Sequence, residues 1–254
     1  MTKKYQAPIV KKAFLILKAI SSAGNGLRIS EISTRLDISK STVHGITAAL
    51  EDQGAIIRDP ESKKYIIGAT LMELGKAAYA KMDFKKAAHP IMERLMEQCR
   101  ETVFLGVRNG DTITIIDLVE SRKDFKISSP IGTSLPLLAG AIGKIFLSEM
   151  IPGDAREYIR SKGLIQFTPN TITDPDIYFK ALESVRNTGV AFDDEEYISG
   201  VRAVAAPLQP QGAYSPAIWV VGFTAGMDDE LIPAIIKQTK TAAREINQKL
   251  AEKP

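Results

Sequence analysis

Apolar residues recur at three- and four-residue steps along the first fifty positions, and this spacing predicts a run of helices. The first helix begins near Pro8, where a proline costs no helical hydrogen bond, and ends at the Gly24-Asn25-Gly26 break. The expected buried stripe of this helix consists of Val10, Phe14, Leu17 and either Ile20 or Ala13.

Two further helices follow at close spacing. Ser30 can cap the first of them, and Asp37 can end it in the left-handed turn conformation. Ser39 can cap the second, which we expect to run to about Gln53 before Gly54 stops it. Its expected inward stripe consists of Val43, Ile46, Thr47 and Leu50.

The pattern then changes to two short β-rich segments. Residues 55–58 and 64–67 are joined by the turn residues Asp59, Pro60, Glu61 and Ser62, which together predict a charged hairpin. Helical spacing returns over residues 71–82, with Leu71, Leu74 and Ala78 on one side. This segment suits a helix that connects two domains.

The second half of the chain mixes both periodicities. We expect a helix over residues 90–100, and then two strands, 103–110 and 111–120, around the tight turn at Asn109, Gly110 and Asp111. Residues 189–192, 201–207 and 218–224 are also typical of strands, and residues 228–249 of a closing helix. The pattern predicts a mixed α/β domain of five or six strands flanked by helices, within an α+β chain.

Charge separates the two halves. The net charge of the whole chain is +3. Residues 1–81 contain 13 Lys and Arg against 7 Asp and Glu, which gives +6, so the remaining 20 against 23 give −3. A basic head on a slightly acidic body is typical of a protein that binds nucleic acid. Ordinary solvated faces of lysine-rich helices are the alternative explanation.

Composition excludes several other classes. The chain has no run of about 18 uncharged apolar residues, and its N-terminus lacks the features of a signal peptide, so we expect a cytoplasmic protein with no membrane partner. The single cysteine, Cys99, cannot form an internal disulfide. With only His44 and His89 beside it, no cluster has metal-ligand spacing, and we expect neither a metal site nor a cofactor.

Two helices joined by a short turn, packed on a preceding helix and followed by a charged hairpin, are the ingredients of a winged helix-turn-helix. In this arrangement the first turn of the second helix enters the major groove, and the hairpin, or wing, contacts the sugar-phosphate backbone. The candidate DNA-binding residues are Ser30, Ser39, Lys40, Ser41, Thr42, His44, Arg58, Lys63 and Lys64. Ser41 and Thr42 could instead only cap the helix, and His44 could be an ordinary surface histidine.

Four motifs in this region occur in a fixed order. They are Lys40-Ser41-Thr42-Val43-His44, Leu50-Glu51-Asp52-Gln53-Gly54, Arg58-Asp59-Pro60 and Tyr65-Ile66-Ile67-Gly68. In these the chain resembles the DNA-binding domain of IclR-family bacterial transcription regulators. It departs from the family at Gly45, where arginine is frequent, and glycine there removes a potential DNA contact and weakens the helix by about 1 kcal/mol.

The resemblance extends over nearly the whole chain, through residues 101–103, 136–144, 193–196 and 200–207. It implies a winged helix-turn-helix domain at 1–69, a linker helix at 70–84 and a GAF-like effector-binding domain at 85–254. The effector-binding residues that it implies or that the local chemistry favours are Leu137, Ala139, Gly140, Ala141, Asp193, Val201, Ala203, Gly222 and Thr224. The small residues 139–141 could instead serve only close helix–sheet packing, and Trp219 could be plain core.

Two of these assignments rest on finer reasoning. Asp193 aligns with the pocket aspartate of the family, and Arg202 lies on the following strand, so one pair of acid and arginine could face inward. Gly222 and Thr224 are two apart, hence on one face of a strand, where relatives often place serines. We expect glycine at 222 to open room for a bulkier or less polar ligand than a small keto acid.

Together these features predict a ligand-responsive transcription regulator rather than an enzyme. It would bind double-stranded operator DNA as a homodimer or homotetramer and sense a small organic acid or an aromatic metabolite. The alternatives are a small-molecule hydrolase with an accessory DNA-binding domain and a nonspecific architectural DNA protein. A hydrolase is disfavoured because Pro136 stands where a nucleophile elbow around Ser134 needs glycine, and because His89 is distant in sequence.

Overall fold

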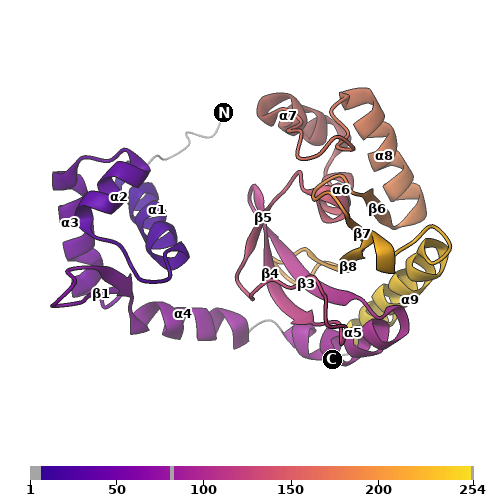
Figure 1. Cartoon of the computed structure of the whole chain (residues 1–254), viewed down its shortest axis with the longest axis horizontal. Coiled ribbons are helices and arrows are strands. Elements are labelled where there is room, and N and C mark those ends of the chain that lie inside the picture. Colours follow the sequence, from indigo (N-terminus) through magenta and orange to yellow (C-terminus); the bar gives the residue numbers. More distant parts are fainter. Residues whose placement is uncertain (1–6, 81–82, 253–254) are drawn as a thin grey trace. The chain divides into compact units, whose positions relative to one another are not determined.

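The computed structural model describes residues 7–80 and 83–252 (Figure 1). Contacts divide the chain into two compact units, Met1–Met82 and Asp83–Pro254. Each unit has its own hydrophobic core.

The N-terminal unit contains the predicted three helices and hairpin. Its elements are α1 (Pro8–Ser22), α2 (Ile29–Leu36), α3 (Lys40–Asp52), β1 (Ile56–Arg58) and β2 (Tyr65–Ile67). The two strands pair antiparallel, with Arg58 opposite Tyr65. Isoleucines from all three helices and from β1 meet Val43 and Tyr65 in one small core. This confirms the predicted winged helix-turn-helix arrangement.

The ends of α2 and α3 show which capping predictions hold. Ser39 is the N-cap of α3, as expected, and Asp37 ends α2 with a φ of 51°. Ser30 does not cap α2, because the helix begins at Ile29 and its N-cap is Arg28, two residues before the expected cap. The Glu31 carboxylate instead accepts the backbone N–H of Arg28 at 2.6 Å, which satisfies a donor at the helix start.

The buried face of α1 differs from the predicted stripe. Ile16, Ala19 and Ile20 are buried, whereas Phe14 is 61% exposed and Val10 is 50% exposed. Because α1 is apolar on most of its circumference, its sequence satisfies the helical spacing on more than one face, and packing against α2 and α3 selects one of them.

A long exposed helix, α4 (Ala69–Ala80), follows the hairpin. Of its predicted stripe, Leu71 is half-buried, while Leu74 and Ala78 are exposed. The predicted end of this helix at Lys81 and Met82 lies outside the described residues.

The C-terminal unit is built on an antiparallel sheet. Its helices are α5 (Asp83–Cys99), α6 (Gly140–Ser148), α7 (Pro152–Lys162), α8 (Pro175–Thr188) and α9 (Ile232–Ala251), with a short 3-10 turn η1 (Thr224–Gly226). Its strands are β3 (Thr102–Asn109), β4 (Thr112–Val119), β5 (Ser134–Pro136), β6 (Ala191–Asp194), β7 (Val201–Pro207) and β8 (Pro216–Phe223). The described strands form one six-stranded sheet in the order β5-β4-β3-β8-β7-β6.

Helices cover both faces of this sheet (Figure 1). One layer is made by α5 and α9, which pack on each other and on the central strands, and the other layer contains α6 with α7 and α8 against it. The start of α5 corrects the prediction of a helix from Pro90, because Pro90 lies inside the helix rather than at its first turn. The mixed α/β domain itself is confirmed.

Phe104 and Trp219 show which strand positions face the α6 layer. They are register partners on β3 and β8, and their rings stack at 5.4 Å between centroids. The indole also lies against Gly106, where an added Cβ would be 2.8 Å from the nearest ring atom. Since alternate residues of a strand face opposite sides, Val221 shares the face of Trp219 and Gly222 does not.

Candidate functional site

Three hydroxyl groups gather at the first turn of α3. The Ser39 hydroxyl accepts the backbone N–H of Thr42 at 3.3 Å, and it lies 2.8 Å from the Thr42 hydroxyl and 3.2 Å from that of Ser41. Ser41 and the neighbouring Lys40 are exposed, and the helix N-terminus carries positive partial charge. This end of α3 can therefore donate hydrogen bonds to a phosphate.

The faces of α3 are clearly divided. Val43, Ile46 and Thr47 are buried against the other helices, while Ser41, His44 and Gly45 are exposed on the outer face. Ser30 is likewise exposed, near the start of α2. The outer face of α3 is free of the core and available to a partner.

The hairpin turn is held by Asp59. Its Oδ1 accepts the Ser62 backbone N–H at 2.7 Å and the Ser62 hydroxyl at 2.6 Å. The hydroxyl bond holds the pKa of this carboxyl below its ordinary value. Lys63 takes a φ of 59° at the turn and is exposed, as is Arg58, while Lys64 is half-buried. The hairpin thus presents cations at a rigid turn.

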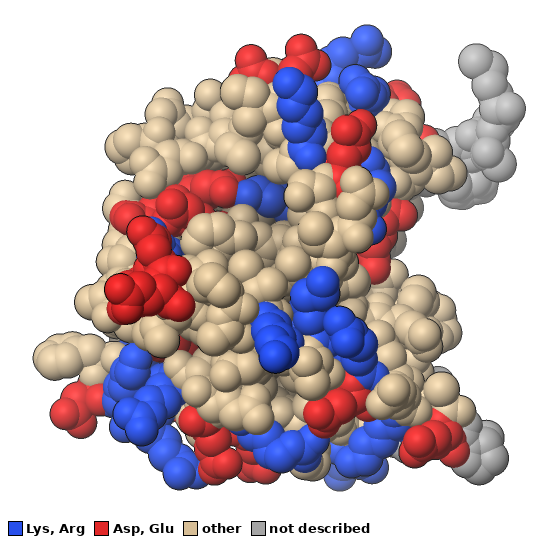
Figure 2. All heavy atoms as spheres, turned by 90° about the vertical axis from the view of Figure 1, so that its right-hand side faces the viewer, with Lys and Arg blue, Asp and Glu red and all other residues tan. Residues whose placement is uncertain are grey.

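Charge on the C-terminal unit is distributed differently. On the side of that unit turned toward the viewer in Figure 2, acidic and basic side chains are interspersed and separated by broad uncharged areas. Such a mixed surface offers no extended basic area for a phosphate backbone. This face therefore adds no candidate DNA contact to those on the N-terminal unit.

A cavity lies between the sheet and the start of α6. Space open to water-sized molecules amounts to about 100 Å³, which is well below the roughly 300–1,000 Å³ of clefts for drug-sized ligands. It is lined by Phe104, Ile115, Ile127, Ser129, Leu135, Ala139, Gly140, Ala141, Ile142, Asp193, Tyr197, Ile198, Val201, Ala203, Trp219 and Val221. Most of this wall is aliphatic or aromatic, so the cavity favours a compact ligand with an apolar body.

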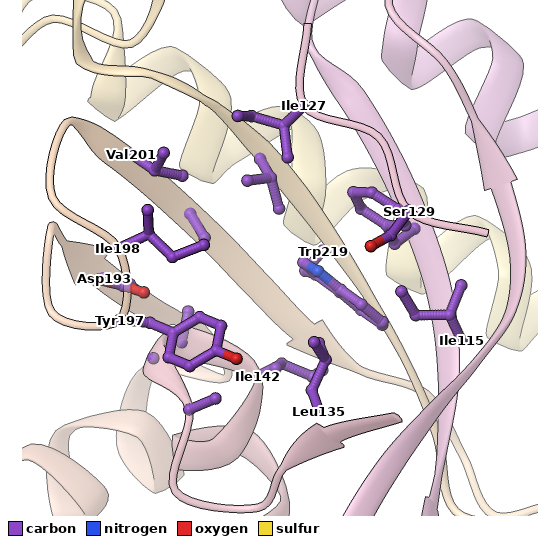
Figure 3. Close-up of a pocket in the computed structure, with 16 residues that line it drawn as sticks. Ile115, Ile127, Ser129, Leu135, Ile142, Asp193, Tyr197, Ile198, Val201 and Trp219 are labelled. Atoms are coloured by element: carbon purple, nitrogen blue, oxygen red, sulfur yellow. The ribbon is translucent and has the colours of Figure 1, made fainter. Parts of the chain in front are cut away.

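The polar groups of the cavity stand on two sides of Trp219. Figure 3 shows Asp193 and the Tyr197 hydroxyl on one side and Ser129 on the other. Gly140, Ala141 and Ile142 form the first turn of α6, where backbone N–H groups have no partner within the helix. The cavity therefore combines an apolar body with hydrogen-bonding groups at its rim.

Asp193 supplies a carboxyl group to the cavity. It is 5% exposed, and burial raises its pKa from 3.8 to about 6. The backbone N–H of Glu196, which donates to its Oδ1 at 2.6 Å, acts in the opposite direction. Lys144 on α6 also opposes the shift and holds the surrounding loop by an ion pair with Glu196. Near neutral pH, Asp193 can exchange a proton within the cavity.

Gly140 allows Asp193 to approach the helix start. Its φ is +49°, and an added Cβ would lie 2.0 Å from Oδ2 of Asp193. The carboxyl group of Asp193 can therefore reach the beginning of α6 only because residue 140 has no side chain.

The cavity includes some predicted effector residues and omits others. Ala139, Gly140, Ala141, Asp193, Val201 and Ala203 line it. Leu137 is buried in the core beneath α6 and is absent from the cavity wall.

Gly222 and Thr224 also lie outside the cavity. Gly222 faces the opposite side of the sheet, where an added Cβ would meet the buried carboxyl of Glu101 at 2.5 Å. The glycine therefore makes room for Glu101, and the expectation that it enlarges the ligand site is wrong. The β8 residues that face the cavity are Trp219 and Val221, so Trp219 is cavity wall as well as core.

The expected inward pairing of Arg202 is also corrected. The register places Arg202 opposite Asp194, and its guanidinium bonds Asp194 at 2.7 Å and Asp229 at 2.9 Å. Asp193 is opposite Ala203 and faces the cavity without this cation. Sequence reasoning missed the two loops that complete the wall, which supply Ile127 and Ser129, and Tyr197 and Ile198. No local pattern marks these loop residues.

Both units match family models. The IclR helix-turn-helix domain matches residues 9–60, and the C-terminal domain of bacterial IclR transcriptional regulators matches residues 76–248. The chain belongs to the IclR family. It is therefore a DNA-binding transcription regulator and, like its relatives, not an enzyme.

Individual IclR-family proteins agree with this assignment. The chain is 34% identical over 234 residues to the transcriptional regulator BhcR of Paracoccus denitrificans, covering 92% of this chain and 83% of the relative. The structure of an IclR regulator from Alicyclobacillus acidocaldarius is 27% identical, with a TM-score of 0.81 and coverage of 96% and 99%. An IclR homologue from Microbacterium hydrocarbonoxydans, crystallised with 4-hydroxybenzoate, shares the fold at 21% identity, with a TM-score of 0.78 and coverage of 96% and 100%.

The rival classes gain no support. The Nδ1 atom of His89 forms a 2.7 Å hydrogen bond with the carboxyl group of Asp117 on β4, and Ser134 is exposed on β5. The hydrolase alternative therefore lacks support from the structure as well as from the relatives. Within the described ranges, no group of three or more His, Cys, Asp or Glu side chains could hold a metal ion. No helix of the described residues is long and apolar enough to span a membrane.

Proposed function

We propose that the chain binds operator DNA through the first turn of α3 and through the hairpin. The supporting observation is the exposed, hydroxyl-rich start of α3 above a buried inner face. Ser39, Lys40, Ser41, Thr42 and His44 would lie in the major groove, and Arg58, Lys63 and Lys64 would contact phosphates, with Ser30 at the edge of the contact.

Removing two of these hydroxyls should weaken DNA binding. We expect Ser41→Ala combined with Thr42→Ala to lower the affinity for the DNA upstream of the chain's own gene by at least about tenfold, because two hydrogen bonds to DNA are lost. Fluorescence anisotropy at fixed salt measures the effect. Ser39 is retained in this variant, so the helix keeps its cap.

The matched control is Ser161→Ala combined with Thr241→Ala. Both of these side chains are exposed on helices of the other unit and donate to carbonyls of their own helix. Equal affinity for the two double variants would contradict the proposed role of α3.

Subunits of a homodimer or homotetramer would place two such helices on a symmetric operator. Exposed apolar side chains support association: Phe14 on α1 is 61% exposed, and Met72 and Leu74 on α4 are 74% and 61% exposed. Large apolar side chains that are exposed in one chain are available for packing between subunits. The linker α4 would then couple the two domains, and sedimentation equilibrium distinguishes the dimer from the tetramer.

We also propose that the effector is a compact organic acid with an apolar, preferably aromatic, body. The small apolar cavity supports the body, and the free N–H groups at the start of α6 support the carboxylate. Ala203 and Val221 add no polar group to the part of the wall that they form, which favours a ring over a short keto acid. The homologue that was crystallised with 4-hydroxybenzoate binds an acid of this kind.

Binding of benzoate, the test ligand, should depend on pH. An anionic ligand beside Asp193 is repelled by the ionised carboxylate and accepted by the protonated form, whose pKa is about 6. We therefore expect affinity to be highest below pH 6 and to fall by up to about tenfold per unit above it. Trp219, the only tryptophan and part of the cavity wall, reports binding through its fluorescence.

Asp193→Asn should remove this pH dependence, because the amide is neutral throughout. Benzamide, a neutral molecule of the same shape, provides the control ligand. Tighter binding of benzamide than of benzoate at pH 5.5, or equal pH profiles for the wild type and Asp193→Asn, would contradict the acid proposal.

A further inference from the structure

Arg28 is fixed at a junction between the helix-turn-helix and the hairpin. The residue before it, Leu27, forms two backbone hydrogen bonds with Tyr65 of β2, at 3.1 Å and 2.8 Å. The loop approaches β2 so closely that a Cβ on Gly26 would lie 2.5 Å from the Tyr65 carbonyl oxygen. Arg28 therefore emerges from a segment that runs directly beside the hairpin.

The side chain of Arg28 reaches the hairpin turn. Its Nε donates to the carbonyl oxygen of Ser62 at 2.8 Å, across 34 residues of sequence. Ser62 is the residue that Asp59 holds, so Arg28 and Asp59 secure the same turn from two directions. The backbone of Arg28 is itself fixed by its N–H bond to Glu31. The fixed backbone of Arg28 and the bond from its Nε to Ser62 together define the direction of the guanidinium.

The terminal nitrogens of this guanidinium remain free. Within the described residues, neither Nη atom of Arg28 takes part in a hydrogen bond or an ion pair, and the side chain is exposed. A guanidinium with two unused N–H pairs matches the oxygens of a phosphate. It stands beside the hairpin that carries Arg58, Lys63 and Lys64.

We infer that Arg28 has two roles in DNA binding: it positions the hairpin through Ser62, and it adds a fourth cation that contacts a backbone phosphate. This inference rests on the proposed DNA-binding surface and adds a residue that lies outside both α3 and the hairpin. The Nε atom serves the hairpin, and the Nη atoms serve the DNA.

The phosphate contact is tested by the salt dependence of binding. For the full-length chain with its own upstream DNA, we expect Arg28→Ala to bind about tenfold more weakly and to reduce the slope of log affinity against log salt by about 0.9, one phosphate contact. Arg35→Ala is the matched control, because Arg35 is an exposed cation of α2 that bonds Ser22 instead of the hairpin. Equal slopes for the two variants would overturn the contact.

The positioning role is tested by amide hydrogen exchange without DNA. Arg28→Ala should speed exchange over residues 59–64, while Arg35→Ala should leave it unchanged. Arg28→Lys retains the charge, but its single ammonium nitrogen cannot bond Ser62 and a phosphate through separate atoms. It should therefore return either the salt slope or the exchange rate of residues 59–64 to the wild-type value, and not both. Full restoration of both by lysine, or unchanged exchange in Arg28→Ala, would overturn the dual role. Failure of the wild type to bind DNA would count against the proposed function, and the exchange result would still decide the positioning role.

Discussion

Gly140→Ala is expected to destabilise the C-terminal unit by on the order of 3 kcal/mol and to abolish binding of benzoate. Two costs add: a side chain at a φ of +49° is strained by about 1–2 kcal/mol, and its Cβ would overlap Oδ2 of Asp193. Asp193 cannot turn away without losing its 2.6 Å bond from the Glu196 N–H. Thermal unfolding should show a fall of roughly 5–10 °C, and Trp219 fluorescence should no longer respond to the ligand.

Gly212→Ala separates the two costs. Gly212 has a φ of +59°, but an added Cβ there meets no atom within 4 Å, so only the backbone strain applies. If the two variants lost the same stability and both still bound benzoate, the contact between Gly140 and Asp193 would have no part in shaping the cavity.

Gly45→Arg is expected to tighten DNA binding by about tenfold and to steepen the salt slope by about 0.9, provided that position 45 touches the DNA backbone. Gly45 is exposed on the outer face of α3, and an added Cβ meets no atom within 4 Å. The substitution also stabilises the helix by up to about 1 kcal/mol.

Gly45→Ala provides the comparison, because it also stabilises the helix by replacing glycine but adds no charge. An equal gain for alanine and arginine would assign the effect to helix stability. An unchanged affinity and slope for arginine would show that this position does not touch DNA. Anisotropy titrations over a range of salt concentrations distinguish these results.

The N-terminal unit was predictable because its signals are local. The Ser39 cap, the left-handed Asp37 and the charged turn after Arg58 each act within a few residues, and the structure shows all of them. The misplaced cap at Ser30 is an error of two residues in the same kind of signal. The buried face of the apolar helix α1 could not be predicted from local signals, because it depends on how the helix packs against its neighbours.

The cavity was predictable only in part because strand orientation is not a local property. The spacing of Gly222 and Thr224 predicted a shared strand face, but β8 ends at Phe223 and Thr224 begins η1. Which face Gly222 takes depends on the pairing of β8 with β3 and β7. The loops that bring Ser129 and Tyr197 to the cavity carry no periodic pattern. Asp193 was found because the family resemblance marked it, and the small residues at the start of α6 because their size alone allows a close approach.

The contact between Trp219 and Gly106 has a consequence for how such a sensor can change its ligand in evolution. Gly106 is absent from the cavity wall, yet the indole that forms part of this wall lies directly on it. Any larger residue at 106 would displace the ring and so change the shape of the wall. A lineage can therefore alter its range of effectors through a single codon in the neighbouring strand and leave every residue of the cavity wall unchanged.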